Sequence, residues 1–175
     1  MDPVTSLKIA KGVPSATFAQ AKNLPIAFGP VAANGNTVLW TINGTLMIID
    51  LGKPTIKYVA DGNNNFPQSY NVVEAPSTSS STWTYWVVQQ AVGAPPIAHP
   101  IHLHGHDSYI LGAGDGQFNV ATHFSQLRFT NPPRRDVIQL KGNGWLVLAY
   151  PTDNPGAVST SNSTSGPTES FSGII

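Results

Sequence analysis

Cysteine is absent from the 175-residue sequence, and charged residues make up only 10% of it. Without a thiol the chain can form no disulfide, thiolate zinc site or iron–sulfur cluster, and it has no cysteine nucleophile. The basic and acidic side chains balance to a formal net charge of zero, and no run of basic residues is longer than Arg134-Arg135. Because nucleic acids and acidic membranes are bound by clustered positive charge, neither is an expected partner.

Long apolar runs are missing too, so no segment is expected to span a bilayer. The start, Met1-Asp2-Pro3-Val4, lacks the basic and apolar regions of a signal peptide, which taken literally predicts an intracellular chain. Two Asn-x-Ser/Thr sequons, Asn43-Gly44-Thr45 and Asn162-Ser163-Thr164, matter only in a secreted protein. The location therefore stays open between these two alternatives.

What the sequence does contain is 16 glycines, 15 prolines and many Thr, Ser, Val and Asn residues, which favour short strands joined by tight turns. We therefore predict an all-β chain of about nine strands without helices, folded as a Greek-key sandwich or barrel. Asn43-Gly44 predicts the turn of a β-hairpin, and Gly142-Asn143-Gly144 predicts a second turn between two strands. The expected strands cover residues 24–28, 37–42, 46–49, 54–59, 70–73, 83–88, 99–112, 134–140 and 145–150.

The length suits one domain, which we expect over residues 24–158. Residues 1–23 show no clear periodicity and are expected to form a poorly ordered lead-in. Residues 159–175 form a Ser/Thr-rich tail that is too polar to order itself by burial. Only its last apolar residues, within Phe171-Ser172-Gly173-Ile174-Ile175, are candidates to dock on the domain.

Four of the five histidines lie within eight residues, His99-Pro100-Ile101-His102-Leu103-His104-Gly105-His106. Imidazole is the commonest metal ligand in proteins, so this density favours metal binding by at least two of them over chance. Alternate side chains of a strand share a face, which places His102, His104 and His106 together and His99 on the other face. The spacing predicts two ligand sets rather than one cage.

Two further residues bear on this site. Asp107 follows the histidines and could either support a metal or orient a histidine from outside the ligand shell. His123 is alone in a long connection, and we expect it to be a surface or locally hydrogen-bonded residue.

The segment His99-Pro-Ile-His-Leu-His-Gly-His-Asp107 resembles the HPxHLHGHD motif of the laccases, within the multicopper oxidases. The resemblance covers roughly residues 24–158 and implies the third cupredoxin domain of an ascomycete-type laccase, a Greek-key β-sandwich. Further segments resemble laccase blocks, and the last three follow the motif in the family's order: Trp83-Thr-Tyr-Trp86, Leu51-Gly-Lys-Pro54, Asn131-Pro-Pro-Arg-Arg-Asp136, Gly144-Trp145 and Thr152-Asp-Asn-Pro-Gly156.

This resemblance implies copper as the cofactor. It implies that His99 binds the type 1 copper, His102 the type 2 copper and His104 one of the type 3 pair, whereas His106 is not usually a ligand. It also implies a secreted protein that oxidises phenolic small molecules and reduces dioxygen to water.

Two departures from the family pattern bear on activity. In laccases the segment corresponding to 154–157 leads into an HCHxxxH motif, which supplies the type 1 cysteine and further histidines; here Val158 leads into the Ser/Thr tail. The first two cupredoxin domains, which carry the other ligands of the trinuclear cluster, have no counterpart in the sequence. We therefore expect a domain that lacks its final strand, has low stability and is inactive as an oxidase by itself.

Three functions follow from these observations. The chain is an oxidase module completed by ligands from elsewhere, or a non-catalytic copper or zinc binder or interaction protein using two or three of His99, His102 and His104. The third, a metallohydrolase, is disfavoured because His102-x-His104-x-His106-Asp107 has its last two residues in the wrong order for an HxHxDH motif.

Overall fold

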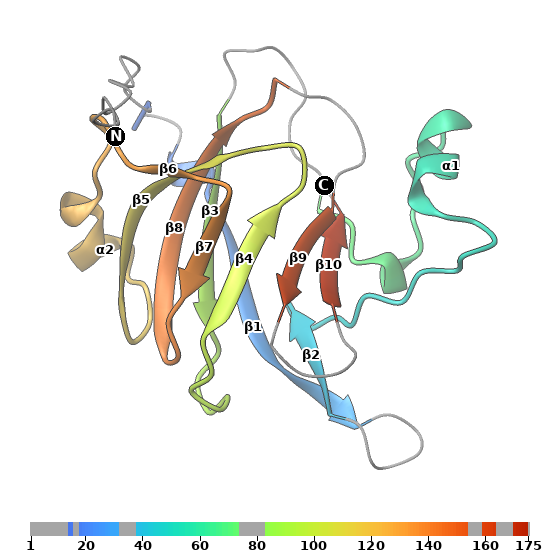
Figure 1. Cartoon of the computed structure of the whole chain (residues 1–175), viewed down its shortest axis with the longest axis horizontal. Helices are drawn as coiled ribbons and strands as arrows, with labels where there is room; N and C mark the ends of the chain where they lie inside the picture. The colour runs from blue at the N-terminus through green and yellow to red at the C-terminus, as the bar shows by residue number, and fades with distance from the viewer. Residues whose placement is uncertain are drawn as a thin grey trace, which may run out of the picture.

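The computed structural model describes residues 14–15, 18–31, 38–73, 83–153, 159–163 and 170–174. In these residues ten strands form two facing β-sheets (Figure 1), as the all-β prediction required. The larger sheet has the strand order β2-β1-β3-β8-β5-β6. Its members are β1 (Lys22–Val31), β2 (Val38–Ile42), β3 (Trp83–Gln90), β5 (Ser108–Asp115), β6 (Arg134–Arg135) and β8 (Gly144–Pro151).

The smaller sheet has the order β10-β9-β4-β7. Its strands are β4 (His99–Leu103), β7 (Val137–Leu140), β9 (Ser159–Ser163) and β10 (Ser170–Ile174). Ile101 and Leu103 of β4 and Leu140 of β7 point inward and pack with residues of the larger sheet in one core. The space between the sheets is therefore the main hydrophobic core, and β4 forms part of its wall.

Strands β3 and β8 are the centre of the fold, and both of their faces are buried. They pair antiparallel with Trp86 opposite Leu148 and Val87 opposite Val147. Trp86 and Leu148 point into the core between the sheets, whereas Val87 and Val147 belong to a second apolar cluster on the outer face. Strands buried on both faces read as continuous apolar runs, which is why the sequence alone located them.

The outer face of the larger sheet is covered by a segment that contains α2 (Val120–His123) and by the 3-10 helix Phe18–Gln20. Phe18 is only 4% exposed, and its ring meets the ring of Tyr85 edge to face at 5.8 Å. The expected boundary at residue 23 is therefore wrong for this part, because Phe18 is a core residue and β1 begins at Lys22. Residues 1–13 and 16–17 of that lead-in lie outside the described residues.

The predicted hairpin at Asn43-Gly44 exists only as its turn. Both residues have the positive φ angles, 53° and 73°, of the expected hairpin turn, and Ile42 bridges Thr45 across it. Residues 46–50 then leave the sheet without forming a strand. β2 pairs with β1 instead, with Phe28 opposite Trp40.

Residues 46–73 form an arm beside the sandwich, with α1 (Thr55–Ala60) and the 3-10 helix Gln68–Tyr70 where strands were expected (Figure 1). Thr55 and Tyr58 are the buried residues of α1, and their spacing of three matches one helical turn. Pro54 precedes this turn, where its fixed φ is compatible with a helix start. No helix among the described residues is long and apolar enough to cross a membrane.

Two of the expected continuous stretches change sheet in the middle. The histidine strand ends at Leu103, the chain turns at Gly105 with a φ of 73°, and β5 continues in the larger sheet. β7 and β8 likewise lie in different sheets, on either side of the turn at Gly142. β7 pairs with β4, whereas β8 pairs with β3 and β5. The expected hairpin over residues 134–150 is therefore a crossover between layers.

Part of the Ser/Thr-rich tail forms strands, contrary to the expectation that it would not order. β9 pairs antiparallel with β4, with Ser161 opposite His102, and β10 pairs with β9. The backbone of β9 thus covers the edge of β4 on the side away from β7. Unpaired strand edges expose hydrogen-bonding groups, so this pairing satisfies backbone groups along that edge of β4.

Candidate metal centre

His99 is buried at the start of β4, on its inward face. The strand alternates between buried and half-buried residues, which places His99, Ile101 and Leu103 toward the core. The His99 side chain has no exposed surface, and its ring meets the Trp40 ring edge to face with the centroids 4.5 Å apart. A metal at His99 would therefore lie within the sandwich, in an aromatic environment.

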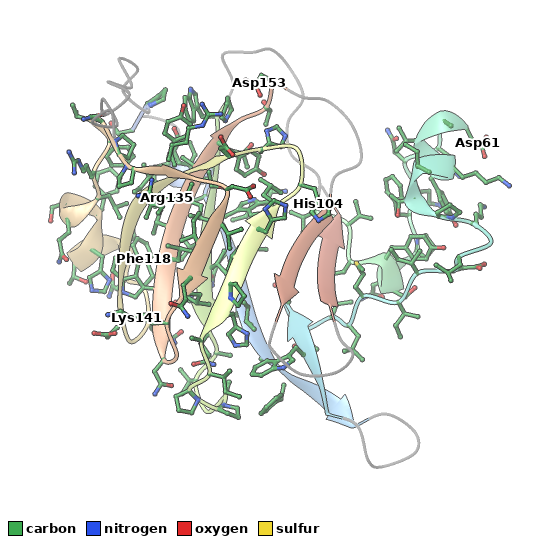
Figure 2. All side chains as sticks on the ribbon, in the orientation of Figure 1. Asp61, His104, Phe118, Arg135, Lys141 and Asp153 are labelled. Atoms are coloured by element: carbon green, nitrogen blue, oxygen red, sulfur yellow. The ribbon has the colours of Figure 1, made fainter. Side chains whose placement is uncertain are left out.

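His102 and His104 come together at the other end of β4. Their ring centroids are 4.9 Å apart, His102 is partly exposed and His104 is exposed. Figure 2 shows His104 just beyond the end of β4, at the side of the sheet where β9 lies. The structure thus joins two of the three predicted ligands and separates them from His99, in agreement with the predicted alternation.

Asp136 fixes the orientation of the His102 ring. The Nδ1 of His102 lies 3.1 Å from the backbone oxygen of Asp136 and 3.0 Å from its carboxylate Oδ1. Both partners accept hydrogen bonds, so Nδ1 must carry the proton and donate it. The remaining nitrogen, Nε2, is then the atom available to a metal, which is how carboxylates position metal-binding histidines.

Asp136 is not among the site residues predicted from the sequence, where Asp107 is the candidate for this role. The Asp107 carboxylate instead pairs with the Arg134 guanidinium at 2.9 Å. Asp136 reaches His102 because β7 pairs with β4, with Val137 opposite His102. The contact between Asp136 and His102 depends on the pairing of His102 with Val137, which lies 35 residues further along the chain. A local sequence motif does not reveal such a pairing.

His106 does not share the face of His102 and His104, contrary to the prediction. The turn at Gly105 redirects the chain, and the His106 side chain is only 6% exposed. Its ring lies 5.3 Å from the ring of Tyr150, and its Nδ1 lies 3.8 Å from Asp153 Oδ1. The regular alternation of a strand stops where the strand ends, which explains the error.

His123 is a locally bonded residue, as predicted. Its Nδ1 accepts a hydrogen bond from the backbone N–H of Asn119 at 2.9 Å, and its ring stacks on Trp145. It lies in α2, on the outer side of the larger sheet.

Within the described ranges, no group of three or more His, Cys, Asp or Glu side chains is arranged to hold a metal ion. The pair of imidazoles at His102 and His104 supplies two nitrogen ligands, which suit copper, nickel or zinc. These two nitrogens fit part of the coordination shell of a copper ion. Water or ligands from another chain would occupy the other coordination positions. The buried imidazole of His99 fits one ligand of a second, separate site.

A two-layer β-sandwich with histidines at both ends of one strand has the architecture of a cupredoxin-like domain. Residues 32–159 match the family model described as multicopper oxidase. This chain belongs to the multicopper oxidase family, whose cofactor is copper.

Similar proteins are fungal laccases. The chain is 44% identical to Laccase-3 of Botryotinia fuckeliana over 142 residues, which are 77% of this chain and 31% of that protein. It is 41% identical to Laccase-1 of Melanocarpus albomyces, over 68% of this chain and 20% of that one. The crystal structure of a laccase from Botrytis aclada superimposes with a TM-score of 0.70 and 32% identity, covering 86% of this chain and 25% of that one. The chain thus spans a third or less of these proteins.

Proposed function

We propose that this chain is a laccase-type third cupredoxin domain that binds copper through His102 and His104. The observation that carries the proposal is the 4.9 Å approach of the two rings, together with the orientation of His102 by Asp136. Nitrogen ligands held in advance lower the cost of ordering the site when the metal binds. When bound in such a protein, copper supplies one-electron chemistry and a site for dioxygen.

His99 is proposed as a separate ligand for a second copper. Its burial against Trp40 keeps water away from one side of the imidazole. Because it lies on the opposite face from His102, it cannot complete the same site. In the family resemblance these positions correspond to a type 1 ligand at His99 and to type 2 and type 3 ligands at His102 and His104.

The activity to which these ligands contribute is the oxidation of phenolic substrates coupled to reduction of dioxygen. The laccase names of the relatives support this proposal, and phenolic small molecules are the proposed substrates. A secreted location is proposed on the same ground.

The second candidate is a non-catalytic copper or zinc binder. The lack of a third ligand group in the described part of the chain favours it for the chain taken by itself, because a two-histidine site binds metal without forming a redox cluster. The two proposals share the metal site and differ in the chemistry performed there.

Titration of the purified chain with Cu(II), followed by electron paramagnetic resonance, tests the metal site. We expect the copper bound at His102 and His104 to show nitrogen hyperfine structure from two imidazoles, and we expect this signal to be lost in the His102→Ala/His104→Ala double variant. The matched control is His123→Ala, which removes an imidazole on the opposite side of the larger sheet and should leave the signal unchanged. Equal binding by the double variant would refute the proposed site.

A further inference from the structure

We propose that Asn43 is an N-glycan acceptor and that the first sugar of its glycan rests in a hollow beside it. Asn43-Gly44-Thr45 is one of two sequons in the chain, and the copper site makes no use of it. A hollow of about 380 Å³ adjoins this turn. The residues lining it are Asn43, Thr45, Asn64, Asn65, Phe66, Gln68, Asn71 and Val72.

The local backbone presents Asn43 as an acceptor. Asn43 and Gly44 form the exposed tip of a turn, held by hydrogen bonds between the backbones of Ile42 and Thr45 at 3.1 and 3.2 Å. The Asn43 backbone N–H donates to the Pro25 oxygen at 2.9 Å, which fixes the tip against β1. The backbone at Asn43 therefore has a defined place, its side chain is exposed, and the threonine hydroxyl that a sequon requires lies two residues away.

The chemistry of the hollow suits a neutral N-acetylated sugar. None of its lining side chains is charged, and five are amides, which both donate and accept hydrogen bonds. Sugar hydroxyls and an acetamido group present the same mixture of donors and acceptors. Phe66 adds one apolar ring, of the kind that packs against the C–H face of a pyranose.

The hollow is built into the fold and is held at the turn itself. The side chain of Asn71 donates from Nδ2 to the backbone oxygen of Ile42 at 3.1 Å, which ties the 3-10 helix segment to the sequon turn. The Phe66 ring packs on Tyr58 with the centroids 5.5 Å apart, which connects the other wall to α1. The wall opposite Asn43 is therefore held in place before a sugar arrives.

The modification is an ordinary glycosyl transfer. The side-chain nitrogen of Asn43 forms a bond to C1 of N-acetylglucosamine, and the C1–oxygen bond to a polyprenyl diphosphate donor breaks. The amide loses one proton, and the diphosphate leaves with the electron pair of the broken bond.

The second sequon provides an internal comparison. Asn162 lies in β9, where it is paired with Ile101 of β4 on one side and with Phe171 of β10 on the other. Once the chain has folded, presenting it to an enzyme requires both strand pairings to open. We therefore infer that Asn43 is glycosylated and that Asn162 is not.

The test is expression of the full chain, behind a secretion leader, in a yeast host, followed by glycopeptide mass spectrometry. We expect glycan at Asn43, its loss in Thr45→Ala, its retention in Thr45→Ser and no change in Thr164→Ala. An unmodified Asn43, or a glycan at Asn162 instead, would overturn the assignment. The result is independent of copper, so it stands or fails separately from the proposed metal site.

Binding of the first sugar in the hollow is tested with an endoglycosidase, which cleaves between the first two N-acetylglucosamine units. We expect the folded glycoprotein to be cleaved roughly fivefold more slowly than the denatured one, the size of effect that one aromatic contact gives. Phe66→Ala and, separately, Gln68→Ala should bring the folded rate toward the denatured rate. Gln68 is exposed, so its variant keeps the test valid if loss of Phe66 unfolds the arm. Equal cleavage rates for the folded and denatured parent protein would refute binding of the sugar in the hollow.

Discussion

Asp136 determines which nitrogen of His102 can meet a metal, and it does so without being a ligand. Its carboxylate and backbone oxygens both lie within about 3 Å of Nδ1 and hold the ring with Nε2 directed away. Removing the carboxylate leaves the backbone acceptor, so the ring becomes less restrained without becoming free.

We expect Asp136→Ala to weaken Cu(II) binding by about tenfold, the lower end of the range for partners that orient ligands. Isothermal titration calorimetry in a buffer that does not bind copper measures the change. Asp153→Ala is the matched control, because that carboxylate lies 3.8 Å from His106 and does not contact His102. Equal losses in the two variants would mean that the overall negative charge, and not the contact to His102, sets the affinity.

Tyr150 is a second residue whose environment has a measurable consequence. Burial raises the pKa of its hydroxyl well above the ordinary value of 10.0, and Thr84 offsets only part of this effect. The folded state therefore holds the phenolic proton more tightly than the unfolded state does. The stabilisation is fully present below the unfolded pKa and is lost as pH rises above about 10.

Urea unfolding at a series of pH values should show this as a decline in the free energy of unfolding above pH ~10. In Tyr150→Phe the decline should be shallower, because the ionisable group is gone. At neutral pH the variant should be close to the parent protein in stability, because the interaction of the buried hydroxyl with Thr84 lacks good hydrogen-bond geometry and its loss costs little. Superimposable pH profiles for the two proteins would contradict the assignment.

At the scale of whole elements, the edge of β4 is the feature on which the smaller sheet depends. β7 covers one side and β9 the other, with His102 opposite Val137 and Ser161. The position of β9 matters because it closes the sheet next to the strand that carries the candidate ligands. An open edge there would expose backbone groups and loosen the inward-facing Ile101 and Leu103.

Deleting residues 159–175 should therefore lower the melting temperature by roughly 3–10 °C, which corresponds to a loss of about 1–3 kcal/mol for a domain of this size. Deleting only 170–175 removes β10, which pairs with β9 alone, and should cost less. Differential scanning calorimetry compares the three proteins. An unchanged melting temperature in the longer deletion would show that β9 does not support the sheet.

The sequence predicted the elements whose pattern is local and missed those fixed by pairing partners. Trp83–Val88 and Trp145–Tyr150 were located correctly because both faces are buried and both read as apolar runs. The apolar residues of 54–59 fit the alternating pattern of a strand, which is why the sequence predicts one there. In the structure this stretch is helical, with Tyr58 buried against Tyr70. A short apolar segment carries too little periodicity to decide between the two.

The same distinction applies to the site. The alternation that separates His99 from His102 was predictable, since it depends only on the geometry of one strand. The diversion of His106 depends on where β4 stops, and Asp136 depends on the register of β7 against β4. The first is set by the passage of the chain from one sheet to the other, and the second by strand pairing within the smaller sheet. A motif of nine residues encodes neither.

For the molecule as a whole, family membership and chemical capacity are different questions. The chain belongs to the multicopper oxidases, yet it spans 31% of Laccase-3 of Botryotinia fuckeliana and contains no cysteine. The intense blue absorption of a type 1 site arises from a cysteine thiolate bound to copper, and the thiolate also tunes the potential that draws electrons from a phenol. No other side chain provides that bond.

The copper-loaded chain should therefore show no intense band near ~600 nm, where thiolate-bound blue copper absorbs, and should oxidise phenols no faster than the His102→Ala/His104→Ala variant treated in the same way. Oxygen consumption with a methoxyphenol as substrate measures the rate, and the double variant corrects for free copper. Two histidines can hold a copper ion, but a four-electron reduction of dioxygen needs several coppers that exchange electrons. A blue band accompanied by turnover would mean that a partner chain supplies a thiolate and further ligands. The domain would then be one subunit of an active oxidase assembled from separate chains.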